Sequence, residues 1–554
     1  MSGLSTAATL SKAGKKVLVL EQNFLLGGGA STYNVNGIDS EIGTYFLGEI
    51  EWRTGEFSSG PSLLGTLYDQ LTDGQLEFVS FDEVSVDKVQ DKIYLGKDNR
   101  KYEIHSGVEW KRGLKRQFPL EHSAINKFFD LVEGADEWRY WVTSLKMLPL
   151  WISNFLCKSG LLNKLTSVFG PTYKGLNMQK MVEDLTHNKD LREVLAFRWN
   201  VGGVTPDDMP VTCGVSIDLH YTKHKSFWPV GGASEIPINM IPVIERSGGK
   251  AFVRAKVEKI LFEGKQATGI QVRDSKNRSH YIYAPNIVSS IGLIETTQLL
   301  PKHLLLKSEL KNFVERVNTG LAFFHATFVL NGTKDALGLT SAASWHFEHM
   351  DLGRTAKQWL LQGLDQALSE ELPTIAYGSN SAKDTTWERV DSHVGKSTIN
   401  AMVPVSWDWF TPFQNVTRED PNGKYEAIKS AIGKKIWDKI TDIDAKLKGR
   451  LIVSHFLTPL DQVDYLGKHK GGVYGMGADM ARFDDPLFIA SLRPMTDIPG
   501  LFLSGQDIGL IGVYANMLTG VMTAGSVLGR NTLVDLLDLH EKIQGSDGVR
   551  RSEL

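Results

Sequence analysis

Two separated groups of residues near the start of the chain have the types and spacing of a nucleotide-binding site. Glu21 ends the apolar run at residues 17–20 and stands 18 residues after Gly3. In a dinucleotide-binding βαβ unit, an acidic residue at that place binds the ribose hydroxyls. The glycines at residues 27–29 allow a backbone to approach a phosphate or a ring closely. Together these residues indicate a site for a nucleotide cofactor.

A third group lies near the other end of the chain. Residues 500–507 are typical of a strand that ends in a polar turn at Asp507. Residues 512–529 follow as a helix whose small residues recur at a spacing that suits close packing against a flat partner. The N-terminus of such a helix favours an anionic phosphate, and Asp507 would lie near the ribityl or phosphate oxygens of a cofactor. An ordinary buried strand and helix is the alternative, but the pairing of Asp507 with Glu21 favours the cofactor site.

The elements that position Glu21 begin with half of a nucleotide-binding unit. Residues 5–13 have the apolar spacing of a helix that ends at Gly14, and residues 17–20 predict a short buried parallel strand. The strand and glycines that normally precede Gly3 are absent. We therefore expect the sequence to be a fragment, with Met1 an internal methionine. An ordinary helix–strand pair over residues 1–21 is the alternative.

A second nucleotide-type block spans residues 227–292. Ser234 is expected to cap a helix, and a hairpin that contains Val257 is expected to turn at Gly264. A short buried strand follows at residues 287–288. Because this block lies far downstream of Glu21, the sequence predicts a discontinuous cofactor domain into which other segments are inserted.

One of those inserted segments is helical and basic. Residues 138–182 contain six basic residues and no acidic one, and residues 147–157 are strongly apolar. The apolar stretch is too short to span a bilayer but suits an interfacial anchor with cationic flanks. A buried helix or the lid of an apolar pocket is the alternative. Both interpretations fit an apolar substrate.

Aromatic clusters mark residues 293–458 as a substrate domain. They stand at residues 323–325, 345–347 and 407–410. Any one of them is more typical of a core than of a binding site. Together they would suit a pocket for a long conjugated or isoprenoid ligand.

Size and composition exclude several other classes of protein. The 554 residues suggest two or three domains, and a net charge of -3 gives no field that favours nucleic acid. Cys157 and Cys213 cannot form a disulfide framework or a zinc cluster, so no metal site is predicted. We expect six segments: residues 1–90, 226–292 and 461–540 for the cofactor domain, 91–225 for the helical insertion, 293–460 for the substrate domain and 541–554 for a tail.

Several stretches resemble the carotenoid and retinoid oxidoreductases, a family that includes phytoene desaturases, carotenoid isomerases and retinol saturases. Residues 13–22 resemble the ribose-binding strand of the family, and residues 228–236, 241–246, 381–387 and 504–507 resemble its retinol saturase branch. The resemblance covers nearly the whole chain. It implies an α/β two-dinucleotide-binding-domain flavoprotein, with a discontinuous Rossmann-like FAD domain. A mixed α+β substrate domain and a helical, membrane-facing insertion would complete the fold.

The resemblance also implies noncovalent FAD, with NAD or NADP as a possible electron donor. The residues that it assigns to FAD lie at strand ends and glycine turns: Gly3, Glu21, Gly27, Gly28, Val257, Gly505 and Asp507. Gly3 would be the last fingerprint glycine, and the backbone of Val257 would meet adenine. Relatives among the desaturases often have arginine where Gly29 stands, so we expect another group to replace that phosphate contact.

The implied activity is reduction of a C=C bond in a polyene isoprenoid, closest to the conversion of all-trans-retinol to 13,14-dihydroretinol. Carotenoid desaturation or cis–trans isomerisation is the first alternative, and a non-catalytic binder of apolar ligands is the second. No catalytic residue is assigned, since a proton could come from water, Glu41, Tyr45 or Tyr474.

The expected partners are an apolar retinoid or carotenoid substrate and a membrane surface, with no nucleic acid. The resemblance implies peripheral attachment at the endoplasmic reticulum membrane, or a plastid. Residues 551–554 loosely resemble an endoplasmic reticulum retrieval signal.

Overall fold

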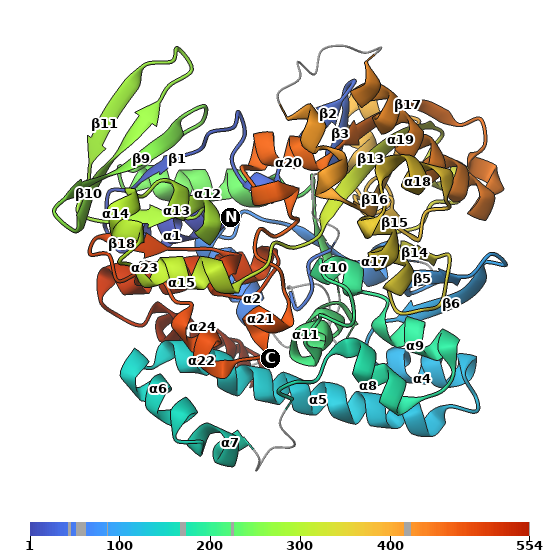
Figure 1. Ribbon diagram of the computed structural model, residues 1–554, viewed down its shortest axis with the longest axis horizontal. Coiled ribbons are helices and arrows are strands. Elements are labelled where there is room, and N and C mark those ends of the chain that lie inside the picture. Colours follow the sequence, from blue (N-terminus) through green and yellow to red (C-terminus); the bar gives the residue numbers. More distant parts are fainter. Residues whose placement is uncertain are drawn as a thin grey trace.

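The computed structural model describes residues 1–41, 46–50, 62–85, 87–166, 173–222, 226–414 and 423–552. Figure 1 shows a cofactor lobe on the left and a sheet-based lobe on the right. The long helix α5 (His122–Ser144) runs below both lobes. Tyr45 and the last two residues of the chain lie outside the described residues.

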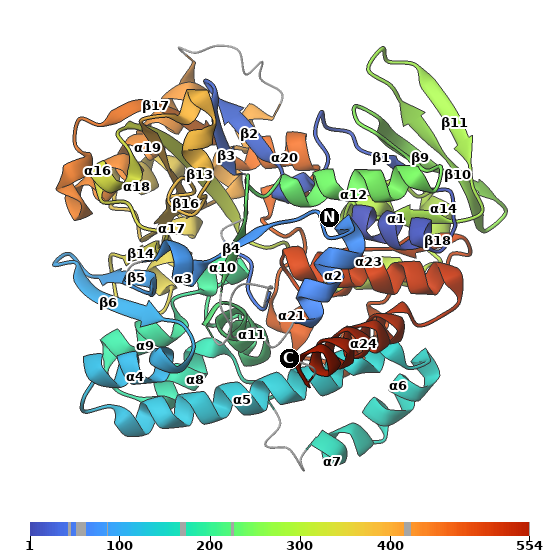
Figure 2. The same cartoon turned by 180° about the vertical axis from the view of Figure 1, so that it is seen from behind.

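Three helices from distant parts of the chain form the centre of the cofactor lobe. Helix α1 (Ser2–Lys12) packs against both α12 (Glu235–Arg246) and α23 (Val513–Leu528), as Figure 2 shows from behind. A Cβ atom on Gly520 of α23 would lie 2.6 Å from the carbonyl oxygen of Ser2. The flat partner expected for the small-residue helix is therefore α1.

Two pairs of parallel strands accompany these helices. Strand β1 (Leu18–Leu20) pairs with β8 (Lys250–Phe252), and β12 (Ile287–Ser289) pairs with β18 (Leu501–Leu503). The predicted parallel strand before Glu21 is thus present, but the prediction that it is buried is wrong. Leu18 is 40% exposed, because among the described residues β1 has a strand partner on one edge only.

The second nucleotide-type block folds largely as expected. Strands β9 (Lys256–Glu263) and β10 (Gln266–Arg273) form the hairpin around Gly264, and β11 (Ser279–Tyr283) adds a third antiparallel strand. Ser234 precedes α12, but its side chain does not cap that helix. Its Oγ instead accepts the N–H of Thr32, at 2.7 Å, and so ties the helix to the strand after the glycine turn.

A seven-stranded sheet forms the second lobe, in the order β17-β13-β16-β15-β14-β5-β6. Its strands are β5 (Val89–Leu95), β6 (Arg100–His105), β13 (Ala322–Asn331), β14 (Ala343–Phe347), β15 (Thr374–Gly378), β16 (Lys396–Val405) and β17 (Leu451–Leu457). Neighbouring strands are antiparallel except for β14 and β5, which are parallel. Residues 89–105 therefore complete a sheet whose other strands lie more than 200 residues further along the chain.

The two faces of this sheet have different neighbours. Because side chains alternate along a strand, Phe324 and Phe328 of β13 share one face, which packs in a single apolar cluster with Ile432 and Ile436 of α19 (Lys424–Ile443). His325 lies on the other face, where directly paired residues form a row across the sheet. The members of that row are His325, Met402, Ala376, Trp345 and Ile93.

The apolar stretch of the helical insertion lies at the surface. Helix α6 (Leu150–Lys158) contains Trp151 and Phe155, whose exposed fractions are 72% and 61%. Helix α7 (Leu161–Thr166) follows it at the lower edge of Figure 1. Over the described part of the chain, no helix has both the length and the apolar character needed to cross a membrane.

A buried group of charges joins the sheet to the helical insertion. The guanidinium of Arg198 donates to Asp91 of β5 and, at 2.9 Å, to Asp218 of α11 (Val211–Thr222). The indole N–H of Trp345 donates to the other oxygen of Asp91, at 2.8 Å. All three charged side chains are at most 5% exposed. Burial nevertheless raises the pKa of Asp218 to about 6, against the opposing effect of Arg198.

We expect Arg198→Met to lower the free energy of unfolding by about 3–5 kcal/mol, because it leaves two buried carboxylates without their cation. Urea unfolding of the variant and of the unchanged protein measures the difference. Arg112→Met is the matched control: Arg112 is 67% exposed, and its ion pair with Glu109 should contribute less than about 1 kcal/mol. Equal effects of the two substitutions would show that the buried charges are not structural.

Candidate functional site

A cavity of about 720 Å³ connects the two lobes. At one end it is lined by Gly3, Glu21 and Val257 of the cofactor lobe. At the other end it reaches His325, Trp345 and Met402 on the inner face of the substrate sheet. A single space thus joins the predicted nucleotide-binding residues to the aromatic residues of the substrate domain.

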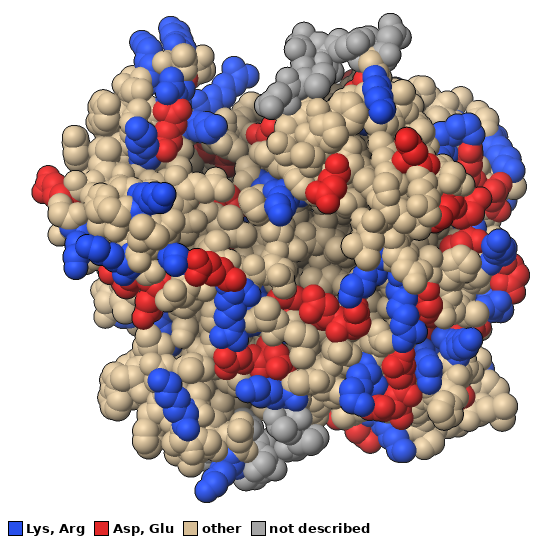
Figure 3. All heavy atoms as spheres, in the orientation of Figure 1, with Lys and Arg blue, Asp and Glu red and all other residues tan. Residues whose placement is uncertain are grey.

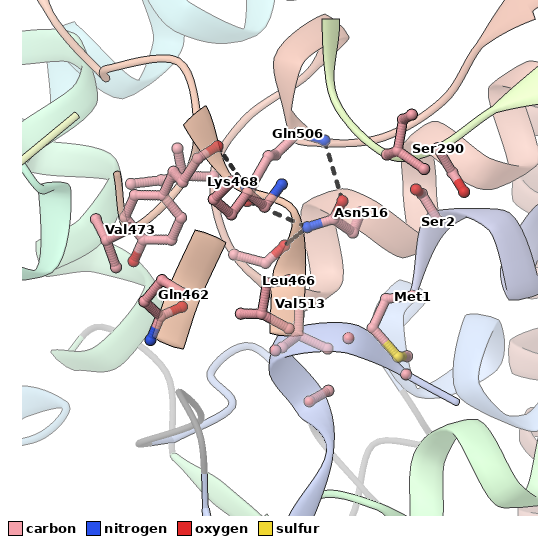
Figure 4. Close-up of a pocket in the computed structure, with 18 of the residues that line it drawn as sticks. Met1, Ser2, Ser290, Gln462, Leu466, Lys468, Val473, Gln506, Val513 and Asn516 are labelled. Carbon is pink, nitrogen blue, oxygen red and sulfur yellow. Dashed lines mark hydrogen bonds between the residues drawn. The ribbon is translucent and has the colours of Figure 1, made fainter. Parts of the chain in front are cut away.

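Figure 4 shows the part of the cavity where α1 meets α23. The backbone N–H of Gln506 donates to Oδ1 of Asn516 at 3.0 Å, and the side chain of Gln506 donates to the carbonyl of Tyr474 at 2.7 Å. Ser2 and Ser290 lie on the same side of this wall. These two hydrogen bonds fix Gln506 relative to Tyr474 and Asn516 in the wall of the cavity.

The predicted cofactor residues fall into two groups. The wall of the cavity includes five of them: Gly3, Glu21, Gly27, Gly28 and Val257. Gly505 and Asp507 do not line it; they lie on either side of Gln506, which does. Oδ2 of Asp507 instead accepts the backbone N–H of Leu293 at 2.6 Å, at the start of α13 (Leu293–Gln298).

The glycine positions fit a nucleotide cofactor sterically. A Cβ atom on Gly3 would lie 2.5 Å from Oγ of Ser290, so the wall is formed there by backbone alone. Gly27 and Gly28 have φ angles of 109° and 60°, which side chains other than glycine rarely adopt. The backbone can therefore approach a bound pyrophosphate closely, as the sequence predicts for this turn.

Two buried carboxylates beside the cavity lack partners for one oxygen each. These atoms are Oδ1 of Asp507 and Oε2 of Glu295, and no described group donates a hydrogen bond to either. Oε1 of Glu295 accepts the backbone N–H of His469 at 2.8 Å, and burial raises the pKa of its carboxyl. Buried acceptors need donors. Glu295 lines the cavity, and the hydroxyls of a ribityl chain are such donors, so its unpaired oxygen fits FAD.

Lys468 is a candidate for the phosphate contact that the desaturases make with arginine. It lines the cavity next to Gly467 and lies beside Gln506 in Figure 4. No ion pair of Lys468 is found among the described residues. The positive charge of Lys468 lowers the pKa of the Glu295 carboxyl and so counteracts the larger effect of burial. An ammonium at this place would bind an anionic pyrophosphate as a point charge.

Lys468→Met should therefore weaken FAD binding by about tenfold, which is the loss of one charge-assisted hydrogen bond. Titration of the apoprotein with FAD, followed by quenching of flavin fluorescence, measures the dissociation constant. The matched control is Lys470→Met, since Lys470 is exposed two residues further on and does not line the cavity. An unchanged affinity in Lys468→Met would rule out this role.

The three groups proposed as proton sources differ in their positions. Glu41 is partly buried and does not line the cavity. Its Oε1 accepts the backbone N–H of Ala233 at 3.1 Å, and desolvation of the carboxyl raises its pKa to about 7. Tyr45 lies outside the described residues. Tyr474 lines the cavity. Of the two described candidates, only Tyr474 is in a position to reach a substrate.

The aromatic clusters are partly site and partly core. His325 and Trp345 line the cavity, whereas Phe324, Trp409 and Phe410 belong to the core on the other face of the sheet. The sequence analysis did not single out Arg198 or Asp91, although both line the cavity. A single arginine and a single aspartate that are far apart in the sequence form no recognisable motif, so the sequence alone did not indicate their role. Side chains alternate between the two faces of the strand over residues 322–330, and this alternation places His325 and Phe324 on opposite faces.

A nucleotide cradle that opens onto an apolar sheet of a second lobe defines an FAD-dependent oxidoreductase. Residues 1–49 match the family model described as an NAD(P)-binding Rossmann-like domain. The chain belongs to the all-trans-retinol 13,14-reductase family. It is 31% identical to the all-trans-retinol 13,14-reductase of Danio rerio over 562 residues, which cover 100% of this chain and 88% of that protein.

Two further relatives bear different names. An inactive all-trans-retinol 13,14-reductase of Danio rerio is 28% identical over 565 residues, which cover 100% of this chain and 88% of that protein. A phytoene desaturase of Cercospora nicotianae is 26% identical over 308 residues, which cover 51% of this chain and 44% of that protein. The predicted membership of the carotenoid and retinoid oxidoreductases is confirmed.

Solved structures confirm the α/β dinucleotide-binding fold. An oxidoreductase from Methanosarcina mazei has a TM-score of 0.56 at 16% identity, over 96% of this chain and 98% of that one. A cofactor-binding variant of putrescine oxidase also has a TM-score of 0.56, at 13% identity, over 95% of this chain and 96% of that one. At these identities the likeness concerns the fold alone.

Proposed function

We propose that this chain reduces one C=C bond of all-trans-retinol, giving 13,14-dihydroretinol, with FAD as its cofactor. The observation that carries the proposal is the identity with an enzyme of that name over the full chain. The cavity supports it, because one space joins the cofactor cradle to a sheet face with apolar side chains. A long polyene could lie along that face with its reacting carbons toward the cradle.

The residues of the chain would orient the substrate and exclude water. Bound FAD supplies the two-electron chemistry. Met402, Ala343 and Trp345 offer an apolar surface on which a flat polyene is desolvated. We propose the phenol oxygen of Tyr474 as the place from which a proton is delivered to the substrate.

Product analysis tests the reaction. We expect FAD-loaded protein to convert all-trans-retinol to a product heavier by two hydrogen atoms when a reductant is supplied. Dithionite, NADH and NADPH, added separately, would show whether a nicotinamide donor serves, as we propose. Chromatography with mass detection measures the product against authentic 13,14-dihydroretinol.

The same experiment with a poly-cis carotene separates the alternatives. The desaturase relative makes carotenoid desaturation or isomerisation the second candidate. A desaturated or isomerised carotene, without any dihydroretinol, would favour that candidate. Protein that binds FAD and retinol but converts neither substrate would be a non-catalytic binder.

We also propose that the helical insertion attaches the protein to a membrane surface. Four large exposed side chains lie on α6 and at the end of α5: Tyr140, Trp141, Trp151 and Phe155. Figure 3 shows that the lower-left surface is mostly uncharged, with isolated basic groups. Lys158 and Lys164 are exposed cations of α6 and α7. Aromatic side chains flanked by lysines suit the headgroup region of an anionic bilayer.

One expected cation of this surface lies elsewhere. The ammonium of Lys146 is turned inward and donates to three carbonyl oxygens, those of Ile489, Leu492 and Ile508. Lys146 therefore fixes the insertion to the cofactor lobe and does not face lipid. The family makes the endoplasmic reticulum membrane our proposed location, with a plastid as the alternative.

The double substitution Trp151→Glu and Phe155→Glu should lower binding to vesicles of phosphatidylcholine and phosphatidylserine by more than about tenfold, because it removes two exposed aromatic side chains that would insert into the bilayer and adds negative charge. Vesicle flotation measures the bound fraction. Leu361→Glu is the control, since Leu361 is 82% exposed at the end of α17 (Arg354–Leu361), far from this surface. Equal binding of all three proteins would refute attachment through α6.

A further inference from the structure

The end of the cavity on the substrate sheet contains a polar group that the proposed reaction does not use. We propose that the imidazole of His325 recognises the hydroxyl of the substrate, and thereby sets the specificity of the cavity for a polyene alcohol. This assignment rests on the proposed function, because it assumes that a polyene occupies the cavity.

The burial pattern of β13 shows where His325 points. Every residue from Ala322 to Leu330 is buried except His325, which is partly accessible. Its cross-strand partner Met402 and, further along the same row, Trp345 also line the cavity. Since directly paired residues point to the same face of a sheet, the accessible surface of His325 faces the cavity.

Four neighbouring side chains at this end donate hydrogen bonds to other residues, although the amide oxygens of Gln90 and Asn200 lack a donor among the described residues. Arg198 and the indole of Trp345 both donate to Asp91. The amide groups of Gln90 and Asn200 donate to Ser226 at 2.8 Å and to Thr374 at 3.0 Å. By contrast, neither ring nitrogen of His325 has a hydrogen-bond partner among the residues that the structure describes. His325 is thus a cavity-facing side chain that has both a donor and an acceptor available for a ligand.

The protonation state of His325 selects the kind of ligand. Burial lowers the pKa of the imidazole to about 4, so the ring is neutral near pH 7. A neutral imidazole has one donor and one acceptor nitrogen. An alcohol both donates and accepts, whereas a carboxylate or an ester oxygen only accepts and a hydrocarbon does neither. The ring therefore matches an alcohol best among these polyene end groups.

The contribution of His325 is measured by comparing two ligands. The first is all-trans-retinol and the second is its deoxy analogue, in which a methyl group replaces CH₂OH. We expect His325→Leu to weaken retinol binding by about 10- to 100-fold, because the substrate hydroxyl is left unpaired in an apolar site. The affinity for the deoxy analogue should change by less than about threefold. Ligand fluorescence of the FAD-loaded protein reports both dissociation constants.

His455→Leu is the matched control, because His455 is a half-buried histidine on the adjacent strand β17 that does not line the cavity. It should leave both affinities unchanged. His325→Phe keeps an aromatic ring of similar size and gives the same comparison if His325→Leu does not fold. His325→Gln retains a donor and an acceptor and should restore part of the preference for retinol.

Three other outcomes would count against the assignment. Equal weakening of both ligands by His325→Leu would show a structural role and overturn it. An unchanged preference for retinol in both the Leu and Phe variants would overturn it while leaving the proposed function intact. Unaltered protein that binds neither ligand would overturn the proposed function, and the assignment of His325 with it.

Discussion

The cofactor end of the cavity depends on a helix crossing that leaves no room for a side chain. Where α1 meets α23, a Cβ on Gly520 would be 2.6 Å from Cβ of Ser5 as well as from the Ser2 carbonyl. The hydroxyl of Ser5 donates to the carbonyl of Met517 at 2.7 Å. This backbone-to-backbone contact brings Gly3 and Glu21 to the segment that holds Gln506 and Asn516. Without it, no common wall would exist for one cofactor.

The substrate end of the cavity depends on a different constraint, the alternation of side chains along β strands. One face of the seven-stranded sheet has the apolar residues that pack with α19. The other face packs in a second apolar cluster with the helical insertion, and part of it lines the cavity. The ion pairs of Arg198 hold the second face in place, because they join β5 to α11 and because Trp345 donates to the same Asp91. A rigid floor of this kind can hold a flat ligand in one orientation relative to the cofactor cradle.

Much of the cofactor lobe could be predicted because its signals are local. A short apolar strand that ends in Glu21, a glycine turn and a hairpin around Gly264 each lie within a few residues, and the structure forms β1, β9 and β10 there. Arg198 and Lys468 gave no such signal, and the aromatic cluster at residues 323–325 did not by itself single out His325. Their roles come from cross-strand register and from contacts between segments more than 100 residues apart, as for Arg198 and Asp91. The sequence analysis did not predict that β5 belongs to the substrate sheet, because its pairing with β14 joins segments that are far apart in the sequence.

The crossing of α1 and α23 also has a consequence for biosynthesis. Ribosomes add about 5–20 residues per second, so roughly 0.5–2 minutes separate the synthesis of α1 from that of α23, which ends at Leu528. During that interval the apolar face formed by Leu4, Ala7 and Ala8 lacks its final partner. The nascent chain thus has an aggregation-prone apolar helix face for most of its translation. A chaperone that shields this face would raise the yield of folded protein.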